Sequence, residues 1–598
     1  MKLVYLALSA ALLAPGCSSV SSTSRPAIAG SADLRQPEGS AGGSAQPGWQ
    51  GTKFAVATAH PLASEAGVEM LRAGGTAIDA AVAAQMVLGL VEPQSSGIGG
   101  GAFLLYHDGR QTVAFDGRET APAAVDEKLF VGADGRPMAF HAAIVGGRAV
   151  AVPGAVRMLE MAHAEYGKRP WASLFEPAIR LAEQGFPVGV RLHTLLKADS
   201  HLRQDAPAAA YFYDHDGQPP AVGSLLRNPA LAATLRRIAS EGSRALHEGE
   251  IAQAIVDKVR QHADNPGKLS MADLAAYQPR RRPPLCSGYA PQTGEPPRHY
   301  LICGFPPPSS GALAIAQILG MLEHSEGAAR SFADPLWMHG YSEASRLAFA
   351  DRAQYVADPD FVAAPAGSWL ALISPAYLAA RARLIGAQSM QVATPGSPSH
   401  APSSHSPMPE QVEQGTSHLS IVDSQGNALA MTSTIEDAFG ARQMVKGFLL
   451  NNQLSDFSFT PHDERGTPVA NRVEPGKRPR SSMSPTLVFD QDSGELVLSG
   501  GSPGGALIIH YTAKLLYATL NWGLAPQQAI DLPNFGSLNG PTLLEEKRFA
   551  PSFVEALRAR GHEVKEIGMS SGVQAIMKVP GGYRGGADPR REGRVLGE

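Results

Sequence analysis

The sequence predicts a layered α/β fold, with strands lying between helices on both sides. Some segments carry apolar residues at helical spacing, and several short apolar runs are joined by turn residues. In addition, 44% of the 598 residues are hydrophobic and only 18% are charged. This composition supplies material for a large core and argues against a globally disordered chain.

The folded body is predicted to open with one short strand and two helices. Residues 53–57 have the pattern of a strand. Residues 61–73 carry apolar side chains at helical spacing, and Gly74 and Gly75 supply the stop. Residues 77–90 are apolar nearly all round, so we expect a buried helix there.

A run of glycines from Gly97 to Gly101 matches a loose dinucleotide-binding pattern. That pattern needs a strand before it and a helix after it. Here a predicted helix and Pro93 come first, and the strand-like residues 103–106 follow. We therefore interpret the run as a glycine-rich turn beside a site, and not as a nucleotide site.

The C-terminal third changes to strands joined by tight turns. Two hairpins are predicted, from residues 418–423 with 428–434 and from residues 484–490 with 495–499. A helix is expected to begin at Gly504, to continue through Leu520 and to stop at Gly523.

The N-terminus has the features of an export signal. Lys2 precedes the apolar residues 3–13, a run too short to span a bilayer, and Cys17 follows shortly after. This order resembles a bacterial lipoprotein signal, in which residues 1–17 direct export and Cys17 is acylated; ordinary signal cleavage is the alternative. Both interpretations predict a periplasmic protein, and the first anchors it to a membrane. Residues 18–50, rich in Ser, Gly, Ala and Pro, are predicted to form a flexible tether.

The cysteines and the charge limit the possible partners. If Cys17 is acylated, Cys286 and Cys303 remain, and an exported protein can join them in a disulfide; two buried thiols are the alternative. There is no CxxC pair, so metal and redox roles lack support. The net charge of −4 and the lack of a basic stripe argue against a nucleic-acid partner.

Residues 388–415 resemble a linker, because they are rich in Ser, Pro, Gly and Gln and cannot bury enough apolar surface to fold. We expect this stretch to be mobile. It ends abruptly at Gly415 and Thr416, directly before a core strand. The boundary divides the body into residues 51–415 and residues 416–598.

A self-processing enzyme would explain this boundary. A break before Thr416 would place a hydroxyl and a new α-amine on one residue, and the amine, with a pKa of about 8, can act as a general base near neutral pH. Threonine activated by its own amine is a known nucleophile. The alternative is that Thr416 simply favours a strand.

The ordered motifs resemble those of the γ-glutamyltransferase family from residue 53 to residue 590. The matching segments are residues 59–63, 97–101, 118–122, 152–154, 306–311, 416–418, 449–453, 477–479, 481–486, 501–505 and 588–590. The resemblance implies a four-layer αββα N-terminal-nucleophile hydrolase. It also implies cleavage between Gly415 and Thr416 into a large and a small subunit that stay together as a heterodimer.

The resemblance further implies the chemistry. Thr416 would attack the γ-carbonyl of glutathione or another γ-glutamyl compound, and water, an amino acid or a peptide would remove the acyl group, with no metal or organic cofactor. Gly504 and Gly505 would donate backbone amides to the oxyanion, where an ordinary tight turn is the alternative. Thr434 would hydrogen-bond the Thr416 hydroxyl.

The remaining implied residues bind the two charged ends of the substrate. Donors to the α-carboxylate would be Arg118, Ser481 and Ser482, although Arg118 in isolation could equally form a surface ion pair. Acceptors from the α-ammonium would be Glu436, Gln453 and Asp456.

Some positions depart from the family pattern. Ser417 follows the nucleophile where many relatives have Thr, and Glu436 stands where some have Asn. Residues 460–476 form a shorter lid without the aromatic residue that walls the pocket in some relatives, so we expect a more open site. An open site admits bulkier acyl groups and keeps a cephalosporin (glutaryl) acylase as an alternative. An unprocessed, non-catalytic binding lipoprotein is a second alternative.

Overall fold

The computed structural model describes residues 46–291, 298–399 and 403–598. The predicted signal peptide, its Cys17 and the tether up to residue 45 lie outside the described residues. The tether prediction is wrong at its end, because Trp49–Gly51 forms strand β1 and pairs with a strand near the C-terminus.

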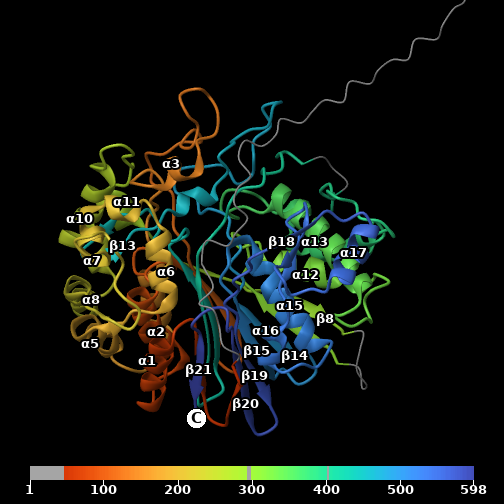
Figure 1. Ribbon diagram of the computed structural model, residues 1–598, viewed down its shortest axis with the longest axis horizontal. Coiled ribbons are helices and arrows are strands. Elements are labelled where there is room, and N and C mark those ends of the chain that lie inside the picture. Colours follow the sequence, from red (N-terminus) through yellow and green to blue (C-terminus); the bar gives the residue numbers. More distant parts are fainter. Residues whose placement is uncertain (1–45, 292–297, 400–402) are drawn as a thin grey trace, which may run out of the picture. The chain divides into compact units, whose positions relative to one another are not determined.

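Two seven-stranded antiparallel sheets form the centre of the body (Figure 1). The first sheet has the order β21 (Arg594–Gly597), β2 (Ala55–Thr58), β10 (Ser417–Val422), β11 (Ala428–Thr434), β3 (Gly101–His107), β4 (Thr112–Gly117), β7 (Arg280–Arg282). The second has the order β1, β20 (Gly582–Ala587), β19 (Gln574–Val579), β15 (Leu496–Gly501), β14 (Thr486–Asp490), β9 (Tyr300–Gly304), β8 (Leu285–Tyr289).

The two sheets pack face to face through alternating side chains. In β3, Phe103 and Leu105 enter the core between the sheets, while Leu104 and Tyr106 face the helices on the other side. Phe103 stacks on Phe305 from the loop after β9, with ring centroids 4.0 Å apart. This alternation is the period of two expected of strands that are buried on both faces.

Helices cover the outer face of each sheet. The first helical layer begins with α1 (Pro61–Arg72) and α2 (Ala77–Val91) and includes α4 (Ala155–Tyr166), α5 (Glu176–Gln184), α6 (Val190–Ala198), α8 (Pro229–Glu241) and α10 (Gly249–Arg260). The second includes α12 (Gly311–Leu322), α13 (Pro335–Tyr355), α15 (Ile508–Leu520), α16 (Pro526–Asp531) and α17 (Pro551–Ala559). The four-layer αββα prediction is confirmed.

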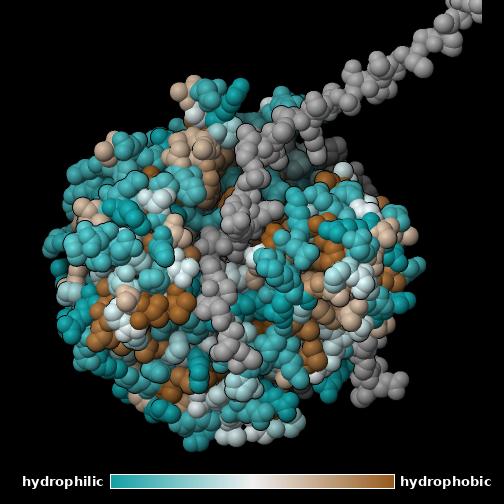
Figure 2. Space-filling view, in the orientation of Figure 1, coloured by the Kyte–Doolittle hydropathy of each residue, from teal (hydrophilic) through white to brown (hydrophobic). Residues whose placement is uncertain are grey.

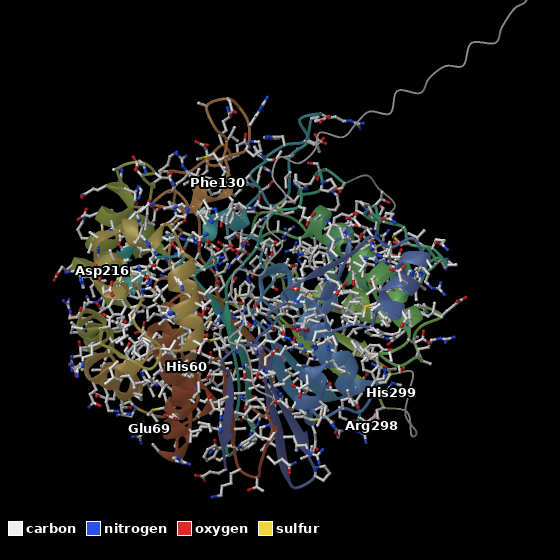
Figure 3. The ribbon with its side chains drawn as sticks, viewed as in Figure 1. His60, Glu69, Phe130, Asp216, Arg298 and His299 are labelled. Atoms are coloured by element: carbon white, nitrogen blue, oxygen red, sulfur yellow. A yellow bond between two sulfur atoms is a disulfide. The ribbon has the colours of Figure 1, made fainter. Side chains whose placement is uncertain are left out.

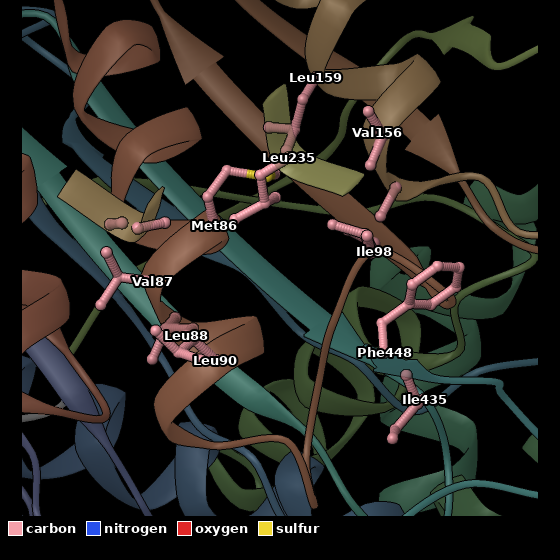
Figure 4. Close-up of a cluster of buried hydrophobic side chains, with 14 of the residues drawn as sticks. Met86, Val87, Leu88, Leu90, Ile98, Val156, Leu159, Leu235, Ile435 and Phe448 are labelled. Atoms are coloured by element: carbon pink, nitrogen blue, oxygen red, sulfur yellow. The ribbon is translucent and has the colours of Figure 1, made fainter. Parts of the chain in front are cut away.

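The buried helix expected at residues 77–90 is α2. Its side chains Met86, Val87, Leu88 and Leu90 belong to the core cluster drawn in Figure 4, where Ile98 of the glycine-rich turn also lies. A capping box between Thr76 and Asp79 fixes the start of the helix. The turn after α2 is thus anchored to the core, and it leads directly into β3.

The expected helix at Gly504 begins later than predicted. A 3₁₀ turn, Gly505–Leu507, comes first, and α15 starts at Ile508. Gly504 and Gly505 have φ angles of 131° and 57°, which are not helical. The two glycines therefore form a bend at the end of β15 and not the first turn of the helix.

The stretch 388–415 contains no helix or strand among its described residues, as expected of a linker. It is nevertheless attached to the body. Met408 is buried and its amide donates to Ala353 O at 2.9 Å, while the amide of Gly396 donates to Asp351 Oδ1 at 2.7 Å. Its mobility stays a prediction, but the uncleaved chain holds it against α13.

A disulfide links the two strands at one edge of the second sheet. A disulfide joins Cys286 in β8 to Cys303 in β9, at positions that pair directly in the sheet.

Hydrophilic residues cover much of the face seen in Figure 2, with smaller hydrophobic groups between them. Within the described residues, no helix has both the length and the apolar character needed to cross a membrane.

Candidate active site

Thr416 lies at the entrance to β10, an inner strand of the first sheet, and only 3% of its surface is exposed. The backbone amide of Gly504 donates to its hydroxyl oxygen Oγ1 at 3.0 Å. The guanidinium of Arg591 donates to its carbonyl oxygen at 3.2 Å. The sheet and the bend after β15 thus fix the hydroxyl in place before any cleavage.

Gly415 adopts a conformation that only glycine fits. Its φ angle is +63°, and a Cβ at this position would lie 1.7 Å from the carbonyl oxygen of Glu436. The hydroxyl of Thr434 donates to the carbonyl oxygen of Gly415 at 2.7 Å and accepts from the amide of Glu436 at 2.7 Å. The carbonyl of the bond before Thr416 is therefore held and polarised by Thr434.

This contact differs from the one we expected for Thr434. The resemblance implied a hydrogen bond to the Thr416 hydroxyl, which stays a prediction. The contact to the Gly415 carbonyl gives Thr434 a direct connection to the bond that would break. Because Thr434 ends β11 and Thr416 precedes the paired strand β10, the hairpin register brings the two residues together.

Gly504 and Gly505 lie against the segment before the nucleophile. A Cβ on Gly505 would lie 1.9 Å from the carbonyl oxygen of Glu413. The close approach of backbone to backbone explains why glycines follow Pro503 here. With the Gly504 amide already 3.0 Å from Thr416 Oγ1, the bend is placed to donate to an oxyanion that forms next to this atom.

Three predicted acceptors of a substrate ammonium lie in one buried group. Gln453 and Asp456 are in a 3₁₀ helix, where Gln453 Nε2 donates to Asp456 Oδ2 at 2.7 Å. Glu436 Oε2 accepts from Asn452 Nδ2 and, at 3.1 Å, from Ser455 Oγ. All are almost inaccessible to solvent.

Burial dominates the electrostatics of the two carboxyls in this group. Burial first, and then the charges of Asp456 and Asp437, raise the pKa of Glu436 well above its ordinary value. Burial likewise raises the pKa of Asp456, against the opposing effect of Arg118. A cation that binds beside these buried carboxyls would stabilise their charged form.

Arg118 is buried and pairs with Asp456, its Nη2 lying 2.5 Å from Oδ2. Its guanidinium also donates to the backbone carbonyls of Pro479 and Arg480 at 3.1 and 2.9 Å. Arg118 is thus no surface ion pair. In the uncleaved chain it links the ammonium acceptors to the loop that carries Ser481 and Ser482.

Of the two serines, Ser482 contacts a carboxylate that belongs to the chain itself. Ser482 Oγ donates to Glu413 Oε2 at 2.5 Å, and Arg352 Nη2 donates to both carboxylate oxygens at 2.6 and 2.9 Å. Arg480 Nη2 completes the set at 3.2 Å. Ser481 supports the loop, since its hydroxyl accepts from the amide of Met483 at 3.1 Å.

The pKa of Glu413 reflects these contacts. Burial alone would raise the pKa, but the charges of Arg352 and Arg480, with the hydrogen bonds from Arg352 and Ser482, hold it at about 2. Sequence reasoning missed Glu413, Arg352 and Arg480 as parts of the site. Arg480 could have been found, because it directly precedes the two serines, but Arg352 lies far away in α13 and gave no local signal.

The stretch 460–476, expected to leave the site open, contacts it through the side chain of Asn471 and packs Val473 near Leu454. Asn471 Nδ2 donates to the carbonyl oxygen of Asp456 at 2.7 Å, and Asn471 Oδ1 accepts from the amide of Arg480 at 2.9 Å. Just before this stretch, Phe459 stacks on Phe130, with centroids 4.4 Å apart; Phe130 is labelled in Figure 3.

A four-layer αββα sandwich with a buried threonine at the start of an inner strand defines the class of N-terminal-nucleophile hydrolases. Within this class, the chain belongs to the gamma-glutamyltranspeptidase family, whose model matches residues 63–598. The predictions of the family and of an enzyme are confirmed.

Curated relatives support this assignment. The chain is 34% identical to the "Glutathione hydrolase proenzyme" of Bacillus subtilis (strain 168), with 91% of each chain covered. It is 34% identical to the protein of the same name from Escherichia coli (strain K12), with 90% of each covered. It is also 34% identical to the "Acylase ACY 1 proenzyme" of Pseudomonas sp. (strain V22), covering 90% of this chain and 92% of the relative.

Similar solved structures include a cephalosporin acylase and a gamma-glutamyltranspeptidase. A cephalosporin acylase from Bacillus halodurans has a TM-score of 0.78 at 28% identity, covering 92% of this chain and 97% of the acylase. The gamma-glutamyltranspeptidase of Helicobacter pylori has a TM-score of 0.51 at 32% identity, covering 55% of this chain and 90% of that one.

Proposed function

We propose that this protein is a self-cleaving γ-glutamyltransferase and glutathione hydrolase with Thr416 as its nucleophile. The observation that carries the proposal is the geometry around one peptide bond. The Thr416 hydroxyl accepts from the Gly504 amide, and Thr434 donates to the adjoining carbonyl of Gly415.

The first reaction cuts the chain. Thr416 Oγ1 attacks the carbonyl carbon of Gly415, and collapse of the tetrahedral intermediate breaks the bond to the Thr416 nitrogen. The product is an ester on Thr416 with a free α-amine. Water hydrolyses the ester, which leaves a carboxylate on Gly415 and a free hydroxyl on Thr416.

The second reaction transfers a γ-glutamyl group. The new amine accepts the hydroxyl proton while Oγ1 attacks the γ-carbonyl, and the protonated leaving amine departs. Water, an amino acid or a peptide then attacks the ester. Amides of Gly504 and Gly505 would stabilise both oxyanions, and the reaction needs no metal or organic cofactor.

The substrate's charged groups select the donor. An α-ammonium would meet Glu436, Gln453 and Asp456. An α-carboxylate would meet Arg118, Ser481 and Ser482, and in the uncleaved chain the Arg118 guanidinium also joins the two sets. The second candidate, glutaryl-cephalosporin cleavage, is favoured by the likeness to a cephalosporin acylase. A glutaryl group lacks the amine, so the buried acceptors support the γ-glutamyl assignment.

The processed form and its location belong to the same proposal. The large subunit (51–415) and the small subunit (416–598) would stay together as a heterodimer. Residues 1–17 would direct export to the periplasm, with Cys17 as the lipid anchor.

Three experiments test the proposal. N-terminal sequencing should find the small fragment beginning at Thr416, and Thr416→Ala should remain one uncut, inactive chain. The purified enzyme should release p-nitroaniline from γ-glutamyl-p-nitroanilide faster than it cleaves glutaryl-7-aminocephalosporanic acid. The reverse preference would establish the acylase, and a single full-length band without turnover would establish a non-catalytic binding protein.

A further inference from the structure

A buried carboxylate contacts the residue that follows the nucleophile. Ser417 Oγ donates to Glu92 Oε2 at 2.8 Å. Glu92 follows directly on α2, and each of the two residues exposes only 1% of its surface. Because Ser417 opens β10, the contact joins the first helical layer to the start of the strand that Thr416 precedes. Neither the cleavage step nor the transfer step uses this pair.

Arg191 of α6 holds the carboxylate in one orientation. Its Nη1 pairs with Glu92 Oε1, and its Nη2 donates to Ser95 Oγ at 3.0 Å. Arg191 is completely buried. A buried carboxylate is costly without a positive partner, so the guanidinium allows Glu92 to remain charged and also fixes its plane. The second carboxylate oxygen, Oε2, is therefore a fixed acceptor for Ser417.

A second route connects the same helix to the nucleophile. The backbone amide of Arg191 donates to Glu592 Oε1 at 3.3 Å. The preceding residue, Arg591, donates to the Thr416 carbonyl oxygen at 3.2 Å. The start of α6 is thus linked to both of the first two residues of the predicted small subunit.

Cleavage makes these downstream contacts more important. In the uncleaved chain Thr416 is restrained from both sides, because Thr434 holds the carbonyl of Gly415 and β10 continues after it. A break before Thr416 removes the upstream restraint and turns the nucleophile into a chain end. Chain ends are poorly ordered unless they are tied down, and a displacement of about 1 Å can cost about a hundredfold in rate. The free nucleophile therefore depends on how firmly Ser417 is held.

We infer that Glu92, oriented by Arg191, is a positioning residue for the nucleophile and acts through the hydroxyl of Ser417. The inference rests on the proposed function, which supplies the cleaved enzyme. Glu92 acts on the place of the Thr416 hydroxyl and amine and not on the groups assigned to the substrate's charged ends. It should therefore set kcat and leave KM nearly unchanged.

The experiment compares wild-type enzyme with Ser417→Ala, Ser417→Thr and a matched control, Ser433→Ala. Ser433 pairs directly with Ser417 across the β10–β11 hairpin and is equally buried, but its hydroxyl donates to Gly101 O at 3.3 Å and not to Glu92. Turnover of γ-glutamyl-p-nitroanilide, expressed per mole of cleaved enzyme, gives kcat and KM. Gel electrophoresis gives the rate of cleavage.

We expect Ser417→Ala to lower kcat about tenfold to a hundredfold with little change in KM. Cleavage of the same variant should slow by a smaller factor, because the upstream restraint is still present during that step. Ser417→Thr retains a hydroxyl and should recover most of kcat. Ser433→Ala should change kcat much less than Ser417→Ala does.

A variant of the ion pair tests Glu92 itself. Replacing Glu92 and Arg191 together with Leu removes both buried charges at once and leaves neither unpaired. The kcat of this double variant should fall as in Ser417→Ala, and adding Ser417→Ala to it should cost nothing further. A further loss of equal size would show that Ser417 does not act through Glu92. The Ser417 variants leave the ion pair intact, so their result does not depend on the folding of this variant.

Three other results would overturn the inference. They are a wild-type kcat in Ser417→Ala, an equal loss in Ser433→Ala, and a Ser417→Thr enzyme as slow as the alanine variant. A Ser417→Ala chain that is never cut would do the same, because the contact would then be needed before the nucleophile becomes a chain end. An uncut, inactive wild-type chain would instead refute the proposed function.

Discussion

At Gly415 a methyl group has no room, and this sets the chemistry next to it. The left-handed φ angle and the nearby Glu436 carbonyl both exclude a side chain. Gly415→Ala should therefore slow cleavage by about tenfold or more, because the strained backbone moves the carbonyl away from Thr434 and Thr416.

The matched control for this substitution is Gly466→Ala. Gly466 has a φ angle of +80° but open space around its Cβ position, so it carries the conformational cost without the collision. Gel electrophoresis at successive times after synthesis measures the cleavage rate of both variants. Equal cleavage rates in the two variants would contradict the steric argument.

A second prediction at the residue scale concerns Thr434. Thr434→Val keeps the shape but removes the hydrogen bond to the Gly415 carbonyl, and cleavage should slow by about a hundredfold. Thr434→Ser retains the hydroxyl and should cleave at a rate near that of the wild type. A valine variant that is cut normally would remove Thr434 from the cleavage mechanism.

The stability of the uncut Thr416→Ala chain should depend on pH because of the Glu413 carboxylate. Its pKa is about 2 in the folded state, against 4.5 for the ordinary carboxyl, so pairing stabilises the fold above pH 4.5. That stabilisation, on the order of 3 kcal/mol, falls away as the pH drops from 4.5 toward 2. Urea unfolding should show Glu413→Gln destabilised at pH 7, with a smaller difference at pH 3.

The control for this titration is Glu464→Gln, since Glu464 is exposed. It should change the free energy of unfolding little at either pH. A Glu413→Gln difference that stays constant between pH 7 and pH 3 would show that the carboxylate is not the stabilising group.

At the scale of elements, the β8–β9 hairpin is held by the bridge between Cys286 and Cys303, 17 residues apart. A bridge that closes a loop of this size lowers the entropy of the unfolded chain and so stabilises the fold by about 3 kcal/mol. Replacing both cysteines with Ala should lower the thermal midpoint, and reductant should lower that of the wild type but not that of the double variant. A thiol count under denaturing, non-reducing conditions checks the bridge directly, and two free thiols from these positions would refute it.

At the scale of the whole molecule, both sheets contain strands from both predicted subunits, paired side by side. In the first sheet, β10 and β11 of the small subunit lie between β2 and β3 of the large one. In the second sheet, β1 and β9 of the large subunit flank a block of small-subunit strands. Separating the subunits would break both sheets and expose the core between them.

The two fragments should therefore migrate together on gel filtration after cleavage and separate only in denaturant. High salt should not separate them, because the core between the sheets is apolar and salt does not weaken such contacts. Dissociation in native buffer would contradict the interleaved arrangement.

The elements were predicted well wherever one periodicity dominated. The strand 428–434 is β11 with the same bounds, and the helix 77–90 differs from α2 by one residue. Predictions were wrong where local pattern and tertiary contact disagreed. Trp49–Gly51 looked like tether but pairs with β20, and the helix after Gly504 starts late because the bend lies against the segment before Thr416.

The sequence by itself determined the layered class and the family, and it predicted the cleavage point and most residues around it, because apolar periodicity and ordered motifs are local properties of the chain. Only the tertiary structure decided that Arg118 pairs with Asp456, and that Arg352 joins Arg480 around Glu413. These pairings depend on which distant elements share a buried space. Buried charges take whichever partner the fold brings within reach, and no spacing along the chain encodes that choice.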